Sequence, residues 1–432
     1  MDFFEKVESK SAEIVVVGAG YVGLPLAVEI CEAGFSVVAM DKREDRVKSL
    51  LEGESYIKDV PSARLRAVIE TGLFEATTDP AVMGDADVVV ICVPTPLRKT
   101  KDPDVSFIMD AAEHLSDRLH SGQLVVLEST TYPGFTREML LPQLETTGLE
   151  VGKGFFLAFS PERVDPGNER YNTRNTPKVV GGITEECLKR LEALYSKFID
   201  NLVPVSSTDA AEMVKLLENT FRAVNIGMVN EVALMCHKLG LNTWEVINAA
   251  ASKPFGFMPF YPGPGLGGHC IPIDPHYLSW KLKTLEYNAR FIELAGEVNS
   301  SMPLVVVERV VDALNAEKKA VNGSKILVLG VAYKRNIDDV RESPALDIID
   351  TLQRKGAEVS FHDPFVDSLW VPGGQLQSVS MENLGVYDCA LIITDHDQVN
   401  YEKVLAELPV VVDTRNATAL YRKGAAAKVV TL

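Results

Sequence analysis

Residues 255–275 form a stretch in which a single thiol, Cys270, lies among glycines, prolines and aromatic side chains. Glycine lets the backbone approach a ligand closely, and proline makes the backbone rigid. The N–H groups of Gly267 and Gly268 can hold an oxyanion, and Asp274 supplies a carboxylate four residues past the sulfur. The pattern predicts a nucleophilic thiol on a rigid loop. The alternative is a tight buried turn in which Cys270 is a small apolar residue.

A second pattern with chemical meaning lies near the start of the chain. An apolar strand at 14–17 runs directly into Gly18-Ala19-Gly20-Tyr21-Val22-Gly23, a helix is expected at 24–33, and a strand at 36–40 leads to Asp41. Glycines between a strand and a helix let a pyrophosphate reach the helix N-terminus, and the acid suits a ribose hydroxyl. We therefore expect NAD binding. Lys42 and Arg43 leave NADP as an alternative, and a purely structural glycine turn is the other.

Further buried strands are predicted at 86–93, 123–127 and 155–159, each followed by a polar loop. Glu162 follows the third of these strands, in the segment Ser160-Pro161-Glu162-Arg163. The loops at the carboxyl ends of parallel strands line the cofactor crevice of such a fold. Glu162 is therefore a candidate site residue, and the alternative is a solvated loop acid.

A long helix is predicted from Asp209 to about His237, with Asp209 and Glu212 as a capping box at its start. Its apolar residues recur every three or four positions: Val214, Leu217, Phe221, Val224, Met228, Val232, Met235 and Leu239. Such a stripe favours a core contact or a dimer seam. Lys215 and Asn219, four residues apart, point the same way. They can donate hydrogen bonds to developing negative charge, or they form an ordinary polar helix face.

From Lys325 the pattern of the first domain returns, with a strand at 325–330, a helix at 344–354 and a strand at 358–362 before Asp363. Strands at 388–394 and 410–412 complete the set. Lys334, Arg341 and Arg415 lie near predicted strand ends or loops, where cations can meet a diphosphate, although each alone is an ordinary surface charge. The sequence thus predicts an α/β protein with two doubly wound Rossmann-like domains joined by a long central helix.

The composition bounds the class of protein. With 432 residues, 46% hydrophobic and 24% charged, the chain is long enough for two or three packed domains. Its six cysteines lack paired or metal spacing, so we expect a reducing compartment and no metal site. A net charge of −17 disfavours nucleic acid and anionic membranes as partners. Residues 1–13 lack the apolar core of a signal peptide, and no apolar run reaches the length of a membrane span, so a cytoplasmic protein is expected.

Separated motifs together resemble the UDP-glucose/GDP-mannose dehydrogenase family over essentially the whole chain. They are GAGYVGLPLA, SPERVDPG, EMVKLLENTFRAVNIGMVNE, GPGLGGHCIPIDP and VLGVAYKRNIDDVRESPA. The resemblance implies an NAD-binding Rossmann domain at 1–205 and a central helical linker at 206–304, which serves dimerisation and carries the cysteine loop. It also implies a UDP-sugar-binding Rossmann-like domain at 305–432, and a homodimer or a higher homo-oligomer.

The resemblance also implies residue roles. Cys270 would be the nucleophile, with Lys215 and Asn219 steadying the oxyanion. Asp274 would assist proton movement or water, and Glu162 and Thr130 would lie beside the reacting carbon. The implied cofactor positions are Gly18, Gly20, Tyr21, Val22, Gly23, Asp41, Arg46, Thr95, Thr130 and Arg341. The implied substrate positions are Glu162, Arg163, Lys215, Asn219, Tyr261, Gly267, Tyr333, Lys334 and Arg415.

The sugar is also approached through the resemblance. Enzymes for UDP-glucose carry a second glutamate near the position of Pro166, and an arginine that the neighbouring subunit contributes lies near the position of Pro254. This chain has neither residue. Its Pro-Glu-Arg segment resembles the subgroup acting on UDP-N-acetylhexosamines, and FGFMPFYPGPGLGGHC is similar to the UDP-N-acetylglucosamine members. The implied reaction is a four-electron oxidation at C6, through a thiohemiacetal and thioester at Cys270, for surface polysaccharide precursors. UDP-glucose and UDP-N-acetylmannosamine are the alternatives.

Two other classes of function stay open on the residues alone. A cysteine hydrolase would use His269 as the base for Cys270, but adjacent residues on a tight loop rarely face each other, and the glycine turn would be unused. A non-catalytic NAD-dependent sensor or scaffold would keep the turn without the chemistry. Formation of NADH from a sugar nucleotide separates the dehydrogenase from both.

Overall fold

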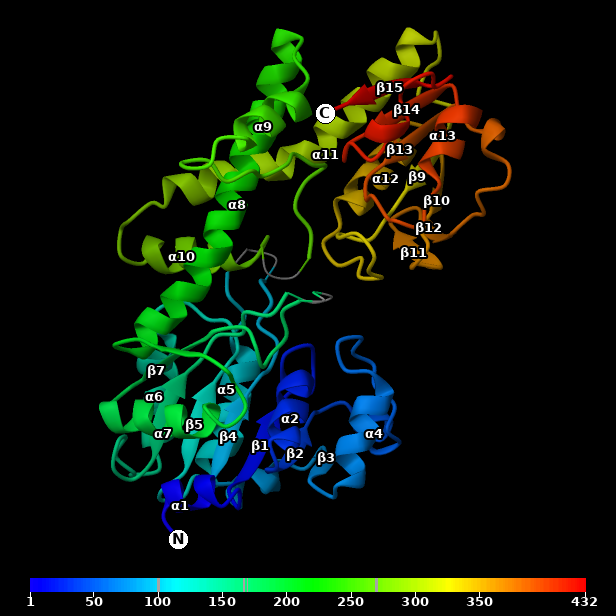
Figure 1. Ribbon diagram of the computed structural model, residues 1–432. Helices are drawn as coiled ribbons and strands as arrows, with labels where there is room; N and C mark the ends of the chain where they lie inside the picture. The colour runs from blue at the N-terminus through cyan, green and yellow to red at the C-terminus, as the bar shows by residue number, and fades with distance from the viewer. Residues whose placement is uncertain (99–101, 166–167, 169, 269–270) are drawn as a thin grey trace. The chain divides into compact units, whose positions relative to one another are not determined.

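The computed structural model describes residues 1–98, 102–165, 168, 170–268 and 271–432 (Figure 1). The chain divides into two compact units. The N-terminal unit comprises Met1–Glu218 and His276–Tyr287, and the C-terminal unit comprises Asn219–Pro275 and Asn288–Leu432. The long helix α8 (Thr208–Leu239) begins in the first unit and ends in the second.

The N-terminal unit is built on one sheet with the strand order β3-β2-β1-β4-β5-β6-β7-β8. The strands are β1 (Glu13–Val17), β2 (Ser36–Met40), β3 (Phe74–Thr77), β4 (Val88–Ile91), β5 (Leu124–Leu127), β6 (Phe156–Phe159), β7 (Lys178–Gly182) and β8 (Leu202–Pro204). The first six strands pair in parallel, in the order that dinucleotide-binding folds use. Strand β7 runs antiparallel to β6, and β8 runs parallel to β7.

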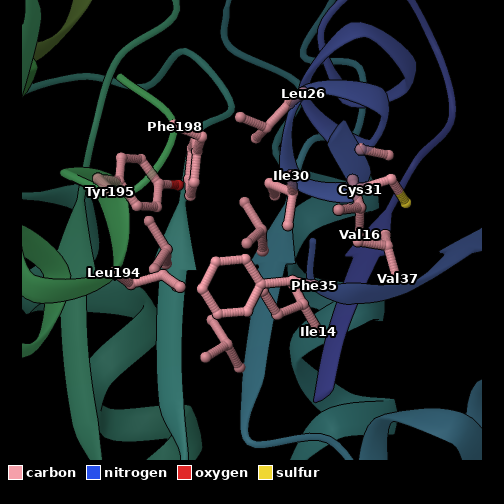
Figure 2. Packing of buried hydrophobic residues seen from close by; sticks show 14 of the residues in the cluster. Ile14, Val16, Leu26, Ile30, Cys31, Phe35, Val37, Leu194, Tyr195 and Phe198 are labelled. Atoms are coloured by element: carbon pink, nitrogen blue, oxygen red, sulfur yellow. The ribbon is translucent and has the colours of Figure 1, made fainter. Parts of the chain in front are cut away.

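Strands such as β4 and β5 are apolar and buried along their whole length, as expected for a parallel sheet that helices cover. The α-helices of the unit that precede α8 are α1 (Phe3–Glu8), α2 (Gly23–Glu32), α3 (Glu44–Leu51), α4 (Ser62–Glu70), α5 (Ser106–Ser116), α6 (Leu141–Glu145) and α7 (Glu185–Tyr195). Figure 2 shows strand residues such as Ile14 and Val16 packed in one core with Ile30 of α2 and Leu194 of α7. These contacts fix β1 and α2, and therefore the turn between them.

The C-terminal unit contains a parallel sheet with the order β10-β9-β13-β14-β15. Its strands are β9 (Lys325–Leu329), β10 (Glu358–His362), β13 (Cys389–Ile392), β14 (Val410–Asp413) and β15 (Lys428–Thr431), and β11 (Ser368–Val371) and β12 (Gly374–Gln377) form a separate hairpin. Helices α11 (Arg290–Ala316) and α12 (Pro344–Arg354) share a core with one face of the sheet. Helix α13 (Tyr401–Glu407) shares a core with the other face. Helices on both faces make this unit doubly wound, so the predicted fold class is confirmed.

Helix α8 starts one residue earlier than predicted, and this changes its cap. The hydroxyl of Ser207 accepts a hydrogen bond from the N–H of Ala210 at 3.1 Å, which makes Ser207 the capping residue. The predicted capping box of Asp209 and Glu212 is therefore wrong. Asp209 lies inside the first turn and binds Arg137, while Glu212 turns toward residues 131–136.

The two faces of α8 differ in residue size. Along its C-terminal half the buried face carries small residues, and a side chain at Gly227 would come within 3.1 Å of Ala295 in α11. The amide of Asn230 donates to Asn299 of α11 at 2.9 Å. The opposite stripe is exposed, with Met228 53% and Leu239 71% accessible. Among the described helices, none combines the length and the apolar character that crossing a membrane requires.

Candidate active site

The glycine turn after β1 has the geometry of a dinucleotide site. Gly18 adopts a φ of 96°, which favours glycine, and a Cβ at Gly23 would lie 1.9 Å from the carbonyl oxygen of Gly18. A Cβ at Gly20 would meet no atom within 4 Å. Two glycines are thus needed by the turn itself, while Gly20 keeps a space open at the start of α2. This space fits a pyrophosphate at a helix N-terminus, where Val22 has no polar side chain to cap the helix.

Asp41, at the end of β2, is fixed beside this turn. One carboxylate oxygen accepts the N–H of Ala19 at 3.0 Å, and Arg46 approaches the same oxygen at 3.2 Å. The neighbouring cations are paired, because Lys42 binds Asp110 and Arg43 binds Asp45. The acid is therefore held at the strand tip where a cofactor ribose would come.

Thr95 and Thr130 follow β4 and β5, at the carboxyl ends of adjacent strands. Thr95 is buried, and its carbonyl oxygen accepts the hydroxyl of Tyr277 at 2.8 Å. The residues flanking Thr130 are both tied down: the hydroxyl of Ser129 donates to the carbonyl of Val93 at 2.8 Å, and that of Thr131 donates to Glu212 at 3.3 Å. Thr130 itself is half-buried between these anchors.

Glu162 follows β6 at the same edge of the sheet. Its Oε1 accepts the N–H groups of Arg163 and Val164, both at 2.6 Å, and the ammonium of Lys215 donates to its carbonyl oxygen at 2.6 Å. Arg163 is itself bound, with its guanidinium on Glu218 at 2.5 Å. Burial acts to raise the pKa of Glu162, but nearby charge and the two backbone hydrogen bonds hold it below its ordinary value. The structure thus brings together Glu162, Arg163 and Lys215, and their roles at the site stay a prediction.

Sequence reasoning missed other buried charges in this unit. Lys178, at the start of β7, forms an ion pair with Glu128 at 2.7 Å, and the hydroxyl of Tyr195 donates to Glu128 at 2.6 Å. Glu128 directly follows β5, and this position at a strand end was a signal that could have found it. Lys178 gave no such signal.

In the C-terminal unit, the glycine loop packs on the turn that follows β9. A Cβ at Gly267 would lie 2.6 Å from the Cβ of Tyr333, and one at Gly268 would lie 2.7 Å from the Tyr333 ring. The N–H of Gly268 donates to the carbonyl of Arg341 at 3.0 Å. The two loops can therefore approach this closely only because the residues are glycines. Cys270 and His269, which follow directly, lie outside the described residues.

Asn219 and Asp274 are brought together, although 55 positions separate them in the chain. The amide of Asn219 donates to the carboxylate of Asp274 at 2.5 Å, and both side chains are buried. Asp274 is the first residue of α10 (Asp274–Lys283). The pair joins the end of the glycine loop to α8.

The other predicted substrate residues of this unit have separate anchors. The ring of Tyr261 stacks on Trp244 of α9 (Thr243–Ala251), with 5.5 Å between centroids, and its hydroxyl donates to Asn248 at 3.0 Å. Arg415, after β14, donates from Nε to the carbonyl of Ile393 at 2.9 Å. A Cβ at Gly263 would lie 2.5 Å from its Nη1, so Arg415 also borders the glycine loop. Lys334 follows Tyr333 in the same turn.

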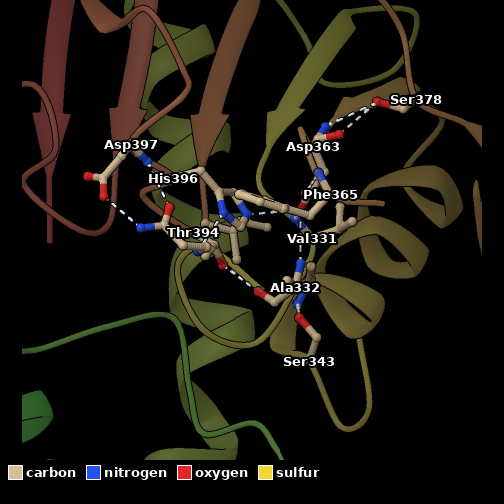
Figure 3. A network of polar contacts seen from close by, with 12 residues as sticks. Val331, Ala332, Ser343, Asp363, Phe365, Ser378, Thr394, His396 and Asp397 are labelled. Atoms are coloured by element: carbon tan, nitrogen blue, oxygen red, sulfur yellow. Dashed lines mark hydrogen bonds and ion pairs between the residues drawn. The ribbon is translucent and has the colours of Figure 1, made fainter. Parts of the chain in front are cut away.

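A buried network holds the turn of Tyr333 and Lys334 (Figure 3). Asp363, after β10, accepts the N–H groups of Val331 at 2.7 Å and Ala332 at 3.1 Å. It also accepts Nε2–H of His396 at 3.0 Å, while Nδ1 of His396 accepts the N–H of Asn336 at 2.9 Å. Burial acts to raise the pKa of Asp363, but the hydrogen bonds from His396 and from backbone N–H groups hold it below the ordinary value. Arg341 lies at the far end of the turn, on Asp339.

The predicted cofactor residues therefore fall into two groups. Gly18, Gly20, Gly23, Asp41 and their flanking residues gather around one turn of the N-terminal unit. Arg341, also predicted to meet the cofactor, belongs to the C-terminal unit. The N-terminal group has the shape and the charge that a dinucleotide requires.

Family models match three successive parts of the chain. They describe the NAD binding domain (residues 12–199), the central domain (209–301) and the UDP binding domain (327–419) of the UDP-glucose/GDP-mannose dehydrogenase family. Together they span most of the sequence.

Individual relatives resemble the chain over nearly its full length. A UDP-N-acetyl-D-mannosamine dehydrogenase of Methanococcus maripaludis is 35% identical, with 89% of this chain and 86% of the relative covered. A UDP-N-acetyl-D-glucosamine 6-dehydrogenase of Pseudomonas aeruginosa is 34% identical, with 90% and 92% covered. The solved structure of a UDP-D-ManNAc dehydrogenase from Pyrococcus horikoshii superposes with a TM-score of 0.86, at 34% identity, covering 94% of this chain and 96% of that one.

The predicted family and NAD as the predicted cofactor are thus confirmed. The chain belongs to the UDP-glucose/GDP-mannose dehydrogenase family and is an NAD-dependent UDP-sugar dehydrogenase.

Proposed function

We propose that this chain oxidises the C6 hydroxyl of a UDP-N-acetylhexosamine to a carboxylate, with UDP-N-acetylglucosamine favoured, and so supplies a uronic acid for surface polysaccharides. One observation carries the proposal. The N-terminal unit combines a dinucleotide turn with a strand-end carboxylate, Glu162, whose backbone carbonyl lies 2.6 Å from the ammonium of Lys215. A fold that only sensed NAD would not need this second group of charges.

The cofactor supplies a hydride acceptor, and removal of four electrons therefore takes two NAD in succession. We propose that Gly18, Gly20 and Gly23 hold its pyrophosphate and that Asp41 holds its ribose. Between the two oxidations the aldehyde must be retained. Cys270 would retain it as a thiohemiacetal, which becomes a thioester at the second hydride transfer and is then cleaved by water.

We assign the developing negative charge to Lys215 and Asn219. An ammonium has three N–H donors, so the bond from Lys215 to the carbonyl of Glu162 leaves capacity for an oxyanion. The amide of Asn219 has two N–H donors, of which one is directed at Asp274. Asp274 would take the proton of the thiol or orient the hydrolytic water, and Glu162 and Thr130 would lie beside C6.

For the nucleotide, we propose Tyr333, Lys334 and Arg415, with Tyr261 and Gly267 from the glycine loop. The support is that the described glycines of this loop pack on Tyr333 and border Arg415. A cationic guanidinium and an ammonium suit a diphosphate. We retain the domain division at 1–205, 206–304 and 305–432 as part of the same proposal.

UDP-N-acetylmannosamine is a second candidate substrate, because relatives named for that sugar are as similar to the chain as those named for the glucosamine epimer. A substrate panel tests the choice. Each UDP-sugar, with UDP-glucose included, is incubated with NAD while absorbance at the nicotinamide band is followed. We expect two NADH per sugar acid, fastest with UDP-N-acetylglucosamine. A ratio of one with released aldehyde contradicts the thioester route, and turnover of the mannosamine epimer alone selects the second candidate.

The role of Cys270 has its own test. Wild type should oxidise the C6 aldehyde with formation of one NADH, whereas Cys270→Ala should not, because no thiohemiacetal can form. Cys270→Ser should form the acid very slowly, since a hydroxyl is a weaker nucleophile than a thiol. NAD affinity should be unchanged in both variants. Turnover of the aldehyde by Cys270→Ala near the wild-type rate would make Cys270 a structural residue.

We also propose that the chain forms a homodimer or a higher homo-oligomer through α8. The exposed stripe supports this, because large apolar side chains such as Leu217, Phe221 and Met235 are about half accessible on a single chain. A second copy presenting the same stripe would cover it. Light scattering of the wild type at increasing concentration tests the proposal, and a single-chain mass throughout would contradict it.

A further inference from the structure

A line of buried charge runs beneath Glu162 in the N-terminal unit. The ammonium of Lys178 lies 2.7 Å from Oε2 of Glu128 and 3.5 Å from Oε2 of Glu162. The side chains of Lys178 and Glu128 are 4% and 0% accessible, whereas that of Glu162 is 16% accessible. One end of the line is thus sealed in the core, and the other end reaches the surface at the candidate site.

The sheet topology creates this line. Parallel strands β5 and β6 deliver Glu128 and Glu162 to the same edge, because both residues follow the carboxyl ends of their strands. Strand β7 runs antiparallel to β6, so its first residue, Lys178, arrives at that edge as well. If β7 were parallel to β6, its first residue would instead lie at the opposite edge of the sheet, where the parallel strands begin.

The bonds of each group fix the orientation of Glu162. Both oxygens of Glu128 are bound, because Tyr195 donates to its Oε1 at 2.6 Å and Lys178 to its Oε2 at 2.7 Å. Glu162 has its Oε1 held by the N–H groups of Arg163 and Val164, so its Oε2 is the oxygen turned toward Lys178. A rotation of the carboxylate would break these contacts.

The charges around Lys178 and Glu162 determine the pKa of the Glu162 carboxyl group. Burial raises the pKa of Glu128, and the pKa of the buried Cys92 thiol is raised well above its ordinary value by burial and then by the charge of Glu128. The pKa of Glu162 is nevertheless lowered, and the charge of Lys178 is the largest influence that opposes burial, ahead of the two backbone hydrogen bonds and the charge of Lys215.

We propose that Lys178 is a positioning residue for the dehydrogenase reaction, which keeps the Glu162 carboxylate ionised and in one orientation at the place of reaction. The inference rests on the proposed function, in which Glu162 lies beside C6. With its carboxylate ionised and oriented, Glu162 can accept a proton from the reacting hydroxyl or from water. Glu128, which itself accepts the hydroxyl of Tyr195, holds Lys178 in place, so that a buried ammonium is available for this purpose.

The variants separate charge from folding. Lys178→Met leaves Glu128 buried without its partner, so the double variant Lys178→Met/Glu128→Gln carries the test, because it removes both members of the buried pair. Glu128→Gln alone is the matched control: it retains Lys178 and leaves Glu162 as the remaining carboxylate near it. Lys178→Arg keeps a positive charge at this position.

Activity is measured as a pH profile of kcat at saturating NAD and UDP-sugar. We expect the acidic limb of the double variant to move up by about one pH unit or more, and kcat on that limb to fall at least about tenfold, since loss of a nearby opposite charge has effects of this size. The acidic limb of Glu128→Gln should stay at the wild-type pH or move to lower pH, and the pH profile of Lys178→Arg should be close to that of the wild type. The KM for the UDP-sugar and the affinity for NAD should change little. A folded double variant with the wild-type profile would overturn the proposal.

A second measurement does not depend on activity. With glutamate labelled at the side-chain carboxyl carbon, the NMR signal of Glu162, assigned by its loss in Glu162→Gln, is titrated in Glu128→Gln and in the double variant. We expect Glu162 to titrate at higher pH in the double variant. Equal titration would overturn the role of Lys178. The expected shift in a protein that forms no NADH with any UDP-sugar would instead refute the proposed function and leave the coupling of Lys178 to Glu162 intact.

Discussion

Glu212, on the first turns of α8, should couple the stability of the N-terminal unit to pH. Its carboxylate is fully buried and accepts hydrogen bonds from the N–H groups of Gly134 at 2.6 Å and Thr136 at 2.9 Å. The hydroxyls of Thr136 and Thr131 also donate to it, at 2.7 and 3.3 Å. Burial raises the pKa of Glu212 to about 7, although the bonds from Thr136 and Gly134 act to lower it.

The sign of the effect follows from the direction of this shift. In the unfolded chain Glu212 ionises near its ordinary pKa of 4.5, whereas in the folded chain it keeps its proton up to about 7. Its contribution to the free energy of unfolding is therefore complete below the unfolded pKa and is lost as the pH rises through the folded one. The full loss is about 3 kcal/mol, because one pKa unit corresponds to about 1.4 kcal/mol.

Glu212→Gln tests this coupling, since glutamine cannot ionise. Urea unfolding of wild type and variant should show a wild-type advantage that is larger by about 2.5 kcal/mol at about pH 5 than at about pH 8. Glu231→Gln, at an exposed position of the same helix, is the control for loss of a glutamate and should track the wild type at both pH values. A wild-type advantage that grows toward the higher pH would show that the hydrogen bonds keep the carboxylate ionised, and would refute the reasoning.

Three further changes should have distinct effects. Gly23→Ala should destabilise the fold by about 1–3 kcal/mol, because its Cβ would meet the Gly18 carbonyl. Gly20→Ala should melt like the wild type yet bind NAD at least about tenfold more weakly. Scanning calorimetry measures the stability and titration calorimetry the NAD affinity of both variants, and a wild-type affinity in Gly20→Ala would contradict the assignment. The wild type should prefer NAD to NADP by at least about tenfold in kcat/KM, or about 1.4 kcal/mol, and Asp41→Asn should reduce this preference. Equal kcat/KM values for the two cofactors in the wild type would mean that Lys42 and Arg43 accept the extra phosphate. Met228→Lys should lower the mass measured by light scattering, and an unchanged oligomer would place the interface elsewhere.

The strands and the glycine turn could be predicted because their causes are local. The strand at 14–17 is continuous in apolar residues, and it is β1 in the centre of the parallel sheet. The positive φ of residue 18 requires glycine, and so does the close approach of the Gly18 carbonyl to residue 23. The spacing of the glycines in the sequence therefore predicts the shape of the turn. The acid at Asp41 follows from the same short segment.

Lys178 and Glu212 could not be assigned in this way, because their surroundings come from distant segments. Lys178 is buried only because β7 reverses direction, which brings it to Glu128, fifty positions earlier in the chain. Glu212 has the spacing of a capping residue relative to Asp209, but the helix begins one residue earlier with Ser207 as its cap. The carboxylate was then free to bind residues 131–136, which no helix pattern indicates.

The two units show how one topology serves two kinds of nucleotide. Asp41 and Asp363 occupy equivalent places, each after the second strand and each accepting an N–H from the first turn of its unit. Asp41 forms an ion pair with Arg46, whose side chain is about one-third accessible, so a ribose hydroxyl can replace part of the contact between Arg46 and Asp41. Asp363 instead binds the fully buried His396, and its carboxylate is closed off from any ligand. The second unit therefore cannot bind a ribose through its strand-tip acid. We therefore propose that recognition in that unit comes from the turn that Asp363 holds in place, which is the turn that carries Tyr333 and Lys334.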